Sequence, residues 1–298
     1  AAVADQDPAV AAAAVSTVPG AKAFSSITEL LRCGLDGVVI ATPTALHAEQ
    51  ALAALAAGAA VFCQKPLARS AAETRRVVET ARANDLLLGV DMSYRFVRGM
   101  TALKRAADDG AIGRIYAADL VFHNAYGPDK AWYYDRVLAG GGCVIDLGIH
   151  LIDLSLWMLD FPKIENVSSR LFERGQAVHA KTGALEDYAV ARIDVQTGAT
   201  INLSCSWRLP AGQDAVIGAS FYGTDGGLSL QNVAGSFYDF RAARFRGTSR
   251  VVLAEPPDPW GGRAATSWAK RLAENGRYDP EVEKSIAVAE VIDAIYNA

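Results

Sequence analysis

The stretch GVVIATPTALHAEQALAALAAGAAVFCQKP (residues 37–66) decides the fold, because it holds one complete strand–helix–strand unit. GVVIAT (37–42) and AAVFCQ (59–64) are continuous apolar runs, as expected of strands buried on both faces. Between them Ala45 to Ala57 favours a helix, and Gly58 ends it. A helix between two such strands predicts that the strands lie parallel in one sheet.

The residues on both sides of this unit repeat the alternation of strand and helix. Ser26 is a predicted helix N-cap, with Glu29 three residues later as its capping-box partner. The other segments are AAVAD (1–5, strand), an Ala-rich helix from Asp7-Pro8, a helix over 70–84 and LLLGVD (86–91, strand). We therefore predict an α/β domain over residues 1–95, built on a doubly wound parallel sheet.

Residues 96–298 predict a second domain of a different class. A long strand, RIYAADLVFHNAYG (114–127), precedes further β-type segments, and the turn Asp225-Gly226 favours antiparallel neighbours. Those segments are ENVSSRLFE, DYAVARIDV, ATINLSCSWRL, DAVIGASFYG and GLSLQN. We expect an α+β domain on a large, open, mainly antiparallel sheet. The last helix, from Pro280 to Tyr296, is a candidate to pack back on the first domain.

Composition excludes several classes of protein. The chain of 298 residues is 51% hydrophobic and 21% charged, as in ordinary globular domains, and its net charge of -4 predicts no nucleic-acid partner. No run approaches the ~18 apolar residues of a membrane span. The opening AAVADQDPAV has neither an initiator Met nor the features of a signal peptide. Four widely spaced cysteines predict reduced thiols and a cytoplasmic protein.

Three strand ends carry polar residues where a doubly wound sheet binds its ligands. Asp5 could accept hydrogen bonds from a ribose, or it could be a turn residue or N-cap. In ATPTALH (41–47), Thr42 and Thr44 should face the ligand crevice, whereas His47 could equally cap a surface helix. Lys65 follows a buried strand and Pro66 restricts it, although most lysines are simply solvated.

The segment GGGCVIDLGIHLIDLSLW (140–157) is the strongest candidate for catalysis. On a helix Asp146 and His150 share a face, and Asp153 lies nearby. A carboxylate beside an imidazole can fix its tautomer and suit it to general acid–base work. The alternatives are a core histidine satisfied by a helical neighbour, or a metal-binding pair, for which no third ligand is evident.

Together these motifs resemble the glucose–fructose oxidoreductase/inositol dehydrogenase/rhizopine-catabolism (Gfo/Idh/MocA) family over nearly the whole chain. The resemblance rests on ATPxxxH, xKP after a buried strand, YRF, GxIG, GGGxxxDxGxHxxDxxxW and the YGTDGGL hairpin. It implies a Rossmann-type domain that holds a dinucleotide. It also implies a substrate domain whose open sheet forms a homo-oligomer, a dimer or a tetramer.

Carried over by position, the resemblance implies that Lys65 and His150 are catalytic and that Asp146 accompanies them. It implies that Asp5 binds the ribose and favours NAD over NADP. The remaining cofactor-side positions are Thr42, Pro43, Thr44, His47, Gln64 and Arg95, and Tyr94 lines the substrate side. Gln64 departs from the family, which has an acidic residue before the lysine. The loss of that charge would lower the proton affinity of the lysine.

No GxGxxG occurs in the chain, although Asp5 should follow that motif by about 20 residues. We therefore expect the first βα unit to be missing, which would expose apolar sheet edges. We also expect the chain by itself to bind NAD weakly, because the glycine loop and helix N-terminus that hold the pyrophosphate are absent.

The implied activity is hydride transfer between a nicotinamide and a secondary alcohol or ketone of a sugar, polyol or related cyclic substrate. His150 would take the hydroxyl proton, Lys65 would bind the same oxygen, and Asp146 would orient the imidazole. Further candidate substrate contacts are Asn124, Trp132 and Arg136, whereas Trp132 and Tyr133 could instead be packing aromatics. The alternatives are a non-catalytic binding or scaffold relic, and a lyase or hydrolase that uses Asp146 and His150.

Overall fold

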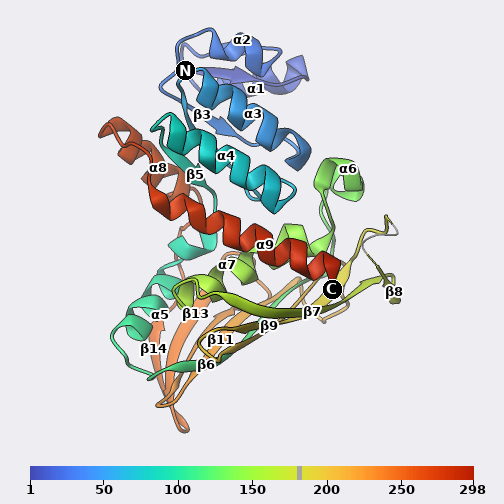
Figure 1. Ribbon diagram of the computed structural model, residues 1–298, viewed down its shortest axis with the longest axis vertical. Coiled ribbons are helices and arrows are strands. Elements are labelled where there is room, and N and C mark those ends of the chain that lie inside the picture. The colour runs from blue at the N-terminus through green and yellow to red at the C-terminus, as the bar shows by residue number, and fades with distance from the viewer. Residues whose placement is uncertain (180–182) are drawn as a thin grey trace.

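The structure is a computed structural model that describes residues 1–179 and 183–298. Figure 1 shows a parallel α/β body around the N-terminus and a large sheet at the opposite end of the long axis. Helix α9 (Lys284–Asn297) lies between the two bodies. The chain therefore crosses from the first body to the second and returns to their junction.

The first body holds two parallel sheets. β1 (Ala2–Ala4) pairs with β2 (Lys22–Phe24), while β3 (Gly37–Ile40), β4 (Ala60–Cys63) and β5 (Leu88–Val90) pair in that order. The predicted parallel pairing is confirmed, as is the fold class. The sheet is nevertheless divided, because no described strand bridges β1 and β3, and each keeps an unpaired edge.

The helices of this body begin at polar caps. The Asp7, Ser26 and Ser70 side chains each accept a backbone N–H in the first turn of the helix that follows. Glu29 returns its carboxylate to the backbone N–H of Ser25, at 3.1 Å, one residue before the position predicted from the capping box. The helices are α1 (Pro8–Ser16), α2 (Ile27–Leu31), α3 (Thr44–Ala56) and α4 (Ala71–Ala83).

Burial differs between the two strands of the quoted segment. β4 is buried at every residue, as predicted. In β3, Val38 and Ile40 are buried, but Val39 is 58% exposed, so the prediction of two buried faces is wrong there. Helix α8 (Arg263–Ala273) explains the difference, because its Trp268 covers Phe62 and Gly37 and leaves Val39 uncovered.

The second body is a nine-stranded sheet in the order β14-β13-β12-β11-β6-β10-β9-β7-β8. Among the strands that the structure describes, only β6 (Ile115–Asn124) and β10 (Thr200–Ser206) pair in parallel, which confirms the predicted mainly antiparallel sheet. The remaining strands are β7 (Ile164–Glu173), β8 (Gln176–Val178), β9 (Tyr188–Val195), β11 (Ala215–Gly223), β12 (Gly227–Asn232), β13 (Phe240–Arg246) and β14 (Ser249–Ala254).

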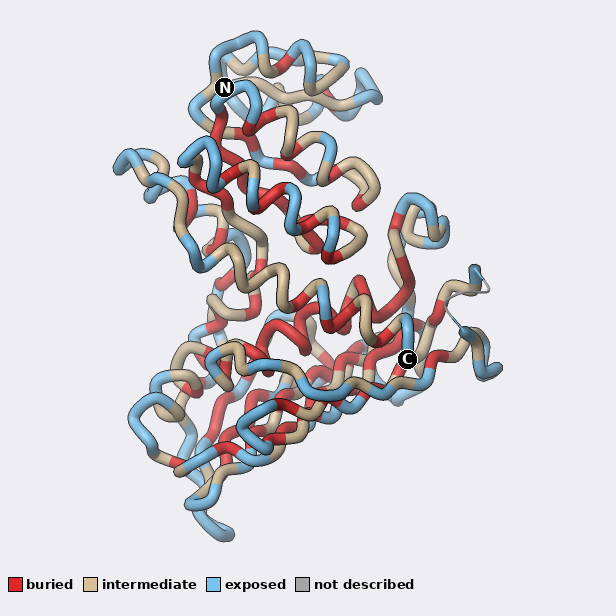
Figure 2. The backbone as a smooth tube through the Cα atoms, viewed as in Figure 1, coloured by how far each residue is buried: buried red, intermediate tan, exposed pale blue. Residues whose placement is uncertain are grey.

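Helices α5 (Arg98–Asp108) and α7 (Ile149–Met158) cover one face of this sheet, and Figure 2 shows α7 and the adjoining strands as largely buried. Along β6 the residues alternate, with Leu120 and Phe122 buried and Asp119 exposed on the opposite side. Asn202 on β10 and Arg192 on β9 are exposed as well. One face of the sheet is thus a core face and the other is open.

Helix α9 contacts α4 of the first body as well as α7 and β7 of the second. The Asp293 carboxylate accepts the backbone N–H of Ala71 at 3.0 Å, and Glu290 pairs with Arg75 at 2.5 Å. The two bodies are therefore joined by hydrogen bonds as well as by the chain itself.

Residues Arg136–Met158 are long and apolar enough, by length and composition, to cross a membrane, which the sequence expectation did not foresee. The segment is 78% buried inside the protein, as the core helix of a globular domain would be. Its apolarity is explained by this position, because α7 packs against the core face of the sheet on one side and α9 on the other.

All four cysteines are free thiols. The fold nevertheless brings two of them together, with the sulfur atoms of Cys143 and Cys205 3.8 Å apart. Burial raises the pKa of Cys143 well above its ordinary value, which keeps this thiol protonated and unreactive.

Candidate active site

The candidate site is built around a wide helical turn. Residues Val144–Gly148 form a π-helical turn, η3, that continues directly into α7. Gly142 precedes it, and a Cβ at this position would lie 1.9 Å from the backbone oxygen of Glu186. The glycine triplet does allow a close approach, as predicted, but Gly142 approaches the backbone of Glu186 and not a ligand.

Glu186 fixes the start of this turn. Its buried carboxylate accepts the backbone N–H groups of Gly142 and Val144, both at 3.0 Å, and the Tyr296 hydroxyl at 2.8 Å. Burial raises the pKa of Glu186, and these hydrogen bonds oppose the rise. Sequence reasoning missed Glu186, because nothing in GALEDYAV marks a buried carboxylate.

Lys65 and Asp146 meet across the junction of the two bodies. The Lys65 ammonium donates to the Asp146 carboxylate at 2.7 Å and to the Asp146 backbone oxygen at 2.5 Å. The other carboxylate oxygen of Asp146 accepts the indole N–H of Trp207 at 3.0 Å. Both side chains are largely buried, at 16% and 11% exposure, so the ion pair is weakly screened.

Asp146 consequently does not orient His150, which corrects the expectation from their spacing. Asp153 does not either, because Arg95 binds both of its oxygens, at 2.8 and 2.5 Å. The reason is electrostatic: each carboxylate is held by a cation that outcompetes a neutral imidazole. The imidazole of His150 makes no hydrogen bond with any residue that the structure describes.

His150 is buried against aromatic rings. Its ring centroid lies 4.7 Å from that of Tyr94 and 6.4 Å from that of Phe122. Burial, helped by the nearby positive charge of Lys65, holds the pKa of His150 well below its ordinary value. The imidazole is therefore neutral at pH 7, which is the form that can accept a proton.

Arg95 lies in the short helix η1 (Ser93–Phe96), and Asp153 binds its Nε and Nη2. Its guanidinium also faces the rings of Trp157 at 5.7 Å and Phe161 at 5.2 Å. Burial raises the pKa of Asp153, and the arginine opposes that rise. In this arrangement Arg95 secures the segment that carries Tyr94, rather than pointing freely toward a cofactor.

His47 is buried and bridges two loops, so the surface-cap alternative does not hold. Its ring nitrogens lie 2.7 Å from the backbone oxygens of Pro66 and Thr42. A neutral ring can donate to only one of these carbonyls, whereas a protonated ring can donate to both, so the two contacts raise the pKa of His47. Burial is the larger effect, and it lowers this pKa. His47 joins the loop after β3 to the loop that carries Lys65.

The remaining cofactor-side residues lie at the carboxyl ends of the parallel strands. Thr44 is buried in the first turn of α3 after Pro43, and Thr42 donates to Gln50 at 2.8 Å. Gln64 donates to Asp91 at 2.8 Å, and burial raises the pKa of Asp91. Asp91 thus brings a carboxyl group beside Lys65, a feature that the sequence did not indicate.

Asp5 follows β1 and accepts the backbone N–H of Asp7 at 2.9 Å. It is therefore a turn residue, as one of its two interpretations required. One carboxylate oxygen takes part in this bond, and the other remains available to a ribose hydroxyl. The donors and acceptors at these strand ends suit the ribose and nicotinamide ends of a dinucleotide. No glycine-rich loop for the pyrophosphate occurs in residues 1–298.

The candidate substrate residues differ in how far they are engaged. The Asn124 amide oxygen is buried and has no hydrogen-bond partner in the described part of the chain. Arg136 donates to the Ala184 backbone oxygen at 2.6 Å. Trp132 and Tyr133 stack at 3.8 Å, and Tyr133 meets Trp207 edge-on, so Tyr133 is a packing aromatic.

Metal binding receives no support from this geometry. Within residues 1–179 and 183–298, no three His, Cys, Asp or Glu side chains gather closely enough to hold an ion. Asp146, His150 and Asp153, the segment considered for a metal pair, instead face different partners.

Two family models match this chain. Residues 1–92 match the one described as "Oxidoreductase family, NAD-binding Rossmann fold", and residues 100–229 match the GFO/IDH/MocA C-terminal domain. The first match includes Lys65 and the second includes His150, whereas residues 93–99 and 230–298 lie outside both.

Two curated proteins illustrate the sequence relationship. D-glucoside 3-dehydrogenase of Escherichia coli (strain K12) is 29% identical over 211 residues, which cover 67% of this chain and 60% of that protein. 1,5-Anhydro-D-fructose reductase of Ensifer adhaerens is 32% identical over 215 residues, which cover 71% of this chain and 62% of that protein. The chain thus spans less than two thirds of the length of these relatives.

Solved structures share the fold. Levoglucosan dehydrogenase in complex with NADH and levoglucosan superposes with a TM-score of 0.82 at 24% identity, covering 99% of this chain and 86% of that one. The agreement extends over both bodies, so their arrangement is a property of the fold.

Proposed function

This chain belongs to the Gfo/Idh/MocA oxidoreductase family, and on that premise we propose that it is an NAD-dependent dehydrogenase of the sugar or polyol type. Its reaction is hydride transfer at a secondary alcohol or ketone of a sugar, polyol or related cyclic substrate. One observation carries this proposal: the Lys65–Asp146 pair joins the two bodies within electrostatic reach of a neutral, buried His150.

Lys65 binds and polarises the substrate oxygen. An ammonium has three N–H donors, and two of them are directed at the Asp146 carboxylate and backbone oxygen. The third is free to donate to the alcohol oxygen and to stabilise the negative charge that develops there. Asp146 positions the ammonium, and Trp207 in turn positions Asp146.

His150 accepts the hydroxyl proton. It is neutral because burial and the charge of Lys65 disfavour its protonation, and its unpartnered ring nitrogens leave room for a substrate hydroxyl. A nicotinamide held by the loops that carry Thr42, Thr44 and Gln64 would supply the acceptor for the hydride of the carbon that bears this hydroxyl. Asp146 is therefore assigned to Lys65 and not to the imidazole.

The cofactor is NAD rather than NADP in this proposal. Asp5 ends β1 with one carboxylate oxygen outside its turn hydrogen bond, where it would accept from a ribose hydroxyl and repel a 2′-phosphate. Thr42, Pro43, Thr44, His47 and Gln64 form the nicotinamide-side loops.

Substrate contacts are assigned to Tyr94, Asn124, Trp132 and Arg136 together with the catalytic pair. Asn124 is the best supported of these, because its buried amide oxygen has no partner among the described residues and could accept from a sugar hydroxyl. We keep the division into a dinucleotide domain over 1–95 and a substrate domain over 96–298.

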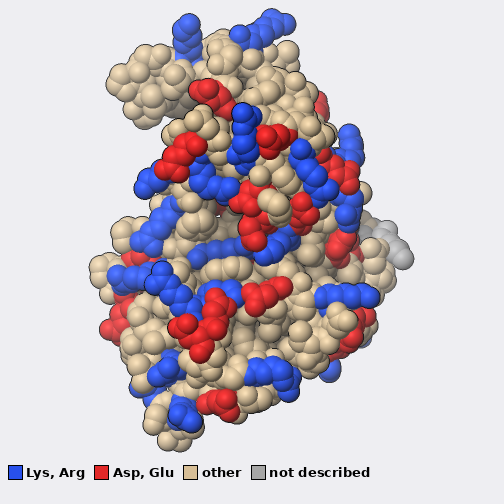
Figure 3. Space-filling view, turned by 60° about the vertical axis from the view of Figure 1, so that its left-hand side comes forward, with Lys and Arg blue, Asp and Glu red and all other residues tan. Residues whose placement is uncertain are grey.

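The partners are a small sugar-like molecule and further copies of this chain, in the cytoplasm. The open face of the large sheet is the proposed contact between copies, in a dimer or a tetramer. A shallow hollow on it is lined by residues of β6, β7, β9 and β10, among them Asp119, Arg170 and Asn202. In the view of Figure 3, basic and acidic side chains are intermixed, without one dominant sign.

The test of the reaction is a turnover assay with NAD, a panel of sugars and polyols, and detection of reduced nicotinamide. At NAD concentrations high enough to offset the weak binding expected without a GxGxxG loop, we expect NAD-dependent oxidation by this chain and its loss in Lys65→Ala. Activity that survives Lys65→Ala undiminished would remove Lys65 from the mechanism.

The test of the cofactor is Asp5→Ser. Removing the carboxylate should narrow the ratio of kcat/KM for NAD to that for NADP, because the repulsion of the 2′-phosphate is lost. An unchanged ratio would place Asp5 outside the cofactor site.

A further inference from the structure

A cavity of about 160 Å³ lies beside β5, the strand at one edge of the parallel sheet. Its walls come from β5, from helices α8 and η1, and from the short helix η5 (Pro280–Glu283). Lys65, Asp146 and His150 are not among the residues that line it. The cavity is therefore separate from the candidate active site.

Aromatic rings form much of the cavity wall. Phe62, Phe96 and Trp268 all line it, and the ring centroids of Phe62 and Trp268 lie 5.7 Å apart. An apolar cavity of roughly 150 Å³ is large enough to bind benzene. The space therefore fits one flat ring with a small substituent.

The charged side chains at this cavity already have partners of opposite sign. The pairs are Arg95–Asp153, Arg271–Asp279 and Lys284–Glu281. The charged residues that line the cavity thus leave no unpaired charge for an ionic ligand, and a neutral ligand suits them better.

The backbone of β5, in contrast, has an open edge on this side. The Asp91 N–H donates to the Cys63 backbone oxygen at 2.9 Å, and in a parallel pair alternate residues bond to the partner strand. Asp91 therefore faces β4, whereas Leu88 and Val90 direct their N–H and C=O groups away from it. The Val90 oxygen accepts the Met92 N–H at 2.8 Å. The other outward groups have no hydrogen-bond partner in the described part of the chain.

These open backbone groups have a defined pattern. Leu88 is only 3% exposed, and buried backbone groups are nearly always paired. The Leu88 oxygen and the Val90 N–H are neighbours along the edge, because one residue of a further parallel strand would bond to both. A primary carboxamide or a lactam carries an N–H and a C=O on the same side. Such a group can donate to the Leu88 oxygen and accept from the Val90 N–H at once.

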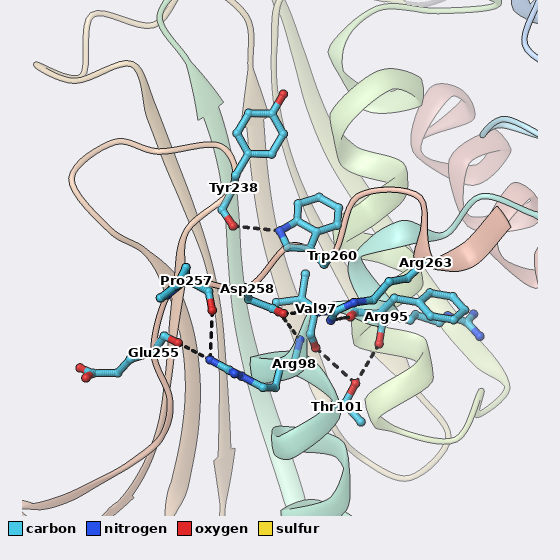
Figure 4. Close-up of polar contacts among 11 residues, drawn as sticks. Arg95, Val97, Arg98, Thr101, Tyr238, Glu255, Pro257, Asp258, Trp260 and Arg263 are labelled. Carbon is cyan, nitrogen blue, oxygen red and sulfur yellow. Dashed lines mark hydrogen bonds and ion pairs between the residues drawn. The ribbon is translucent and has the colours of Figure 1, made fainter. Parts of the chain in front are cut away.

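The walls of the cavity are held together by hydrogen bonds within the protein. Figure 4 shows the Asp258 carboxylate between Arg98 and Arg263; it accepts the Arg98 backbone N–H at 2.7 Å and the Arg263 guanidinium at 2.5 Å. Arg263, the first residue of α8, also donates to the Phe96 backbone oxygen at 2.9 Å. These bonds fix α8 against η1, so the cavity is formed before a ligand enters, as ligand sites usually are.

We propose that this cavity is a binding site for a flat aromatic ring that bears a carboxamide or lactam group. The ring lies between the aromatic walls, and the amide completes the edge of β5 as one residue of a further strand would. The proposal does not depend on the dehydrogenase function, because it concerns a separate cavity and binding alone.

The first experiment uses benzamide as the probe and Trp268 as the reporter. With fluorotryptophan incorporated at the five tryptophan positions, fluorine NMR reports each indole, and Trp268→Phe assigns the signal from the cavity. Benzamide should shift this signal saturably with no cofactor present. Acetophenone has nearly the same shape but no amide N–H, so it should bind about three- to tenfold more weakly, as expected for one lost hydrogen bond. Equal affinities, or no saturable shift with benzamide, would overturn the proposal.

The second experiment locates the ligand. Ser267 lines the cavity from α8, so Ser267→Phe should fill the space and abolish the benzamide-induced shift. Thr266→Phe is the matched control, because Thr266 is an exposed neighbour on the same helix that does not line the cavity. Benzamide binding that survives Ser267→Phe would place the ligand elsewhere, at the nicotinamide-side loops for example, and would reject this site. If Ser267→Phe does not fold, the comparison of benzamide with acetophenone still decides.

Discussion

At the scale of single residues, the site pairs Asp146 and Asp153 each with a cation and leaves the histidine without a charged partner. Asp146 holds Lys65, Asp153 holds Arg95, and His150 is surrounded by aromatic rings. This arrangement separates the two tasks of the reaction. In the proposed reaction, the ion-paired lysine stabilises the oxyanion, and the imidazole kept neutral by burial accepts the proton.

His150→Asn should lower kcat by about 100-fold or more, because general acid–base catalysis typically contributes that much. NAD affinity should change little, because the side chain is assigned to the substrate and not to the nucleotide. Steady-state kinetics and NAD titration measure the two effects. Near-normal turnover with an intact fold would make His150 a structural residue.

The same residue predicts a pH profile. The pKa of His150 lies well below its ordinary value of 6.5. As pH decreases, kcat/KM for alcohol oxidation should therefore begin to decrease only below pH 6.5, where His150 becomes protonated. The depressed pKa has a matching effect on stability. As pH falls, His150 is protonated in the unfolded chain before it is protonated in the folded one. The free energy of unfolding should therefore decrease as pH falls below the pKa of His150 in the unfolded chain. Loss of the decrease in kcat/KM in His150→Asn would assign it to this residue.

Asp146→Asn should lower kcat about 10- to 100-fold, since it weakens a charge-assisted hydrogen bond worth ~1.5–3 kcal/mol. Combining it with Lys65→Ala should add little, because both changes disable the same group. Trp207→Phe is the matched control: it removes only a neutral donor to Asp146 and should cost a few-fold in kcat. Fully additive losses would mean that Asp146 serves His150 instead.

At the scale of elements, the π-helical turn at Val144–Gly148 matters most. It places Asp146 toward the first body. It also leads into α7, whose second residue, His150, lies against the rings of Tyr94 and Phe122. Glu186 anchors its N-terminal end through two backbone N–H groups. A π-helical turn at such a position is typical of functional sites.

Gly142→Ala should lower the free energy of unfolding by ~1–3 kcal/mol, the usual cost of overpacking. The new methyl group would meet the Glu186 backbone oxygen, which cannot move without breaking the hydrogen bond from Cys143. Gly261→Ala is the control, because nothing lies within 4 Å of its Cβ position. Urea denaturation of both variants measures the difference, and equal stabilities would contradict the close approach.

At the scale of the whole molecule, the site exists only because the two bodies meet. Lys65 comes from the loop after β4, its partner Asp146 comes from η3, and Trp207, which donates to Asp146, directly follows β10. Helices α8 and α9 return to the first body and hold the junction. Catalysis in this proposal therefore depends on the relative placement of the bodies.

Self-association should use the open sheet face. Val121 lines the hollow and lies on the face of β6 opposite Leu120. Val121→Glu would bury a charge between the copies, so it should shift a dimer or tetramer toward monomer. Val10→Glu, a matched change at a residue of α1 that is 50% exposed, should have no effect. Sedimentation velocity distinguishes the species. A monomeric natural chain would rule out this interface.

Local signals in the sequence were enough to predict most of the elements, the parallel and antiparallel character of the sheets, and the two segments that meet at the site. These follow from local signals: apolar runs such as 59–64, caps such as Ser70, and the xKP and DxGxH motifs. The motifs carried Lys65, Asp146 and His150 through family resemblance, without specifying which of them touch.

Only the tertiary structure decided the pairing. Spacing on one helix favoured Asp146 with His150, four residues apart, but the observed bonds join Asp146 to Lys65 across 81 residues and Arg95 to Asp153 across 58. Helical periodicity describes neighbours on one element, whereas a buried carboxylate binds the strongest cation that packing brings within reach. Glu186 and Trp207 acquire their roles in the same way, because their partners lie on other elements.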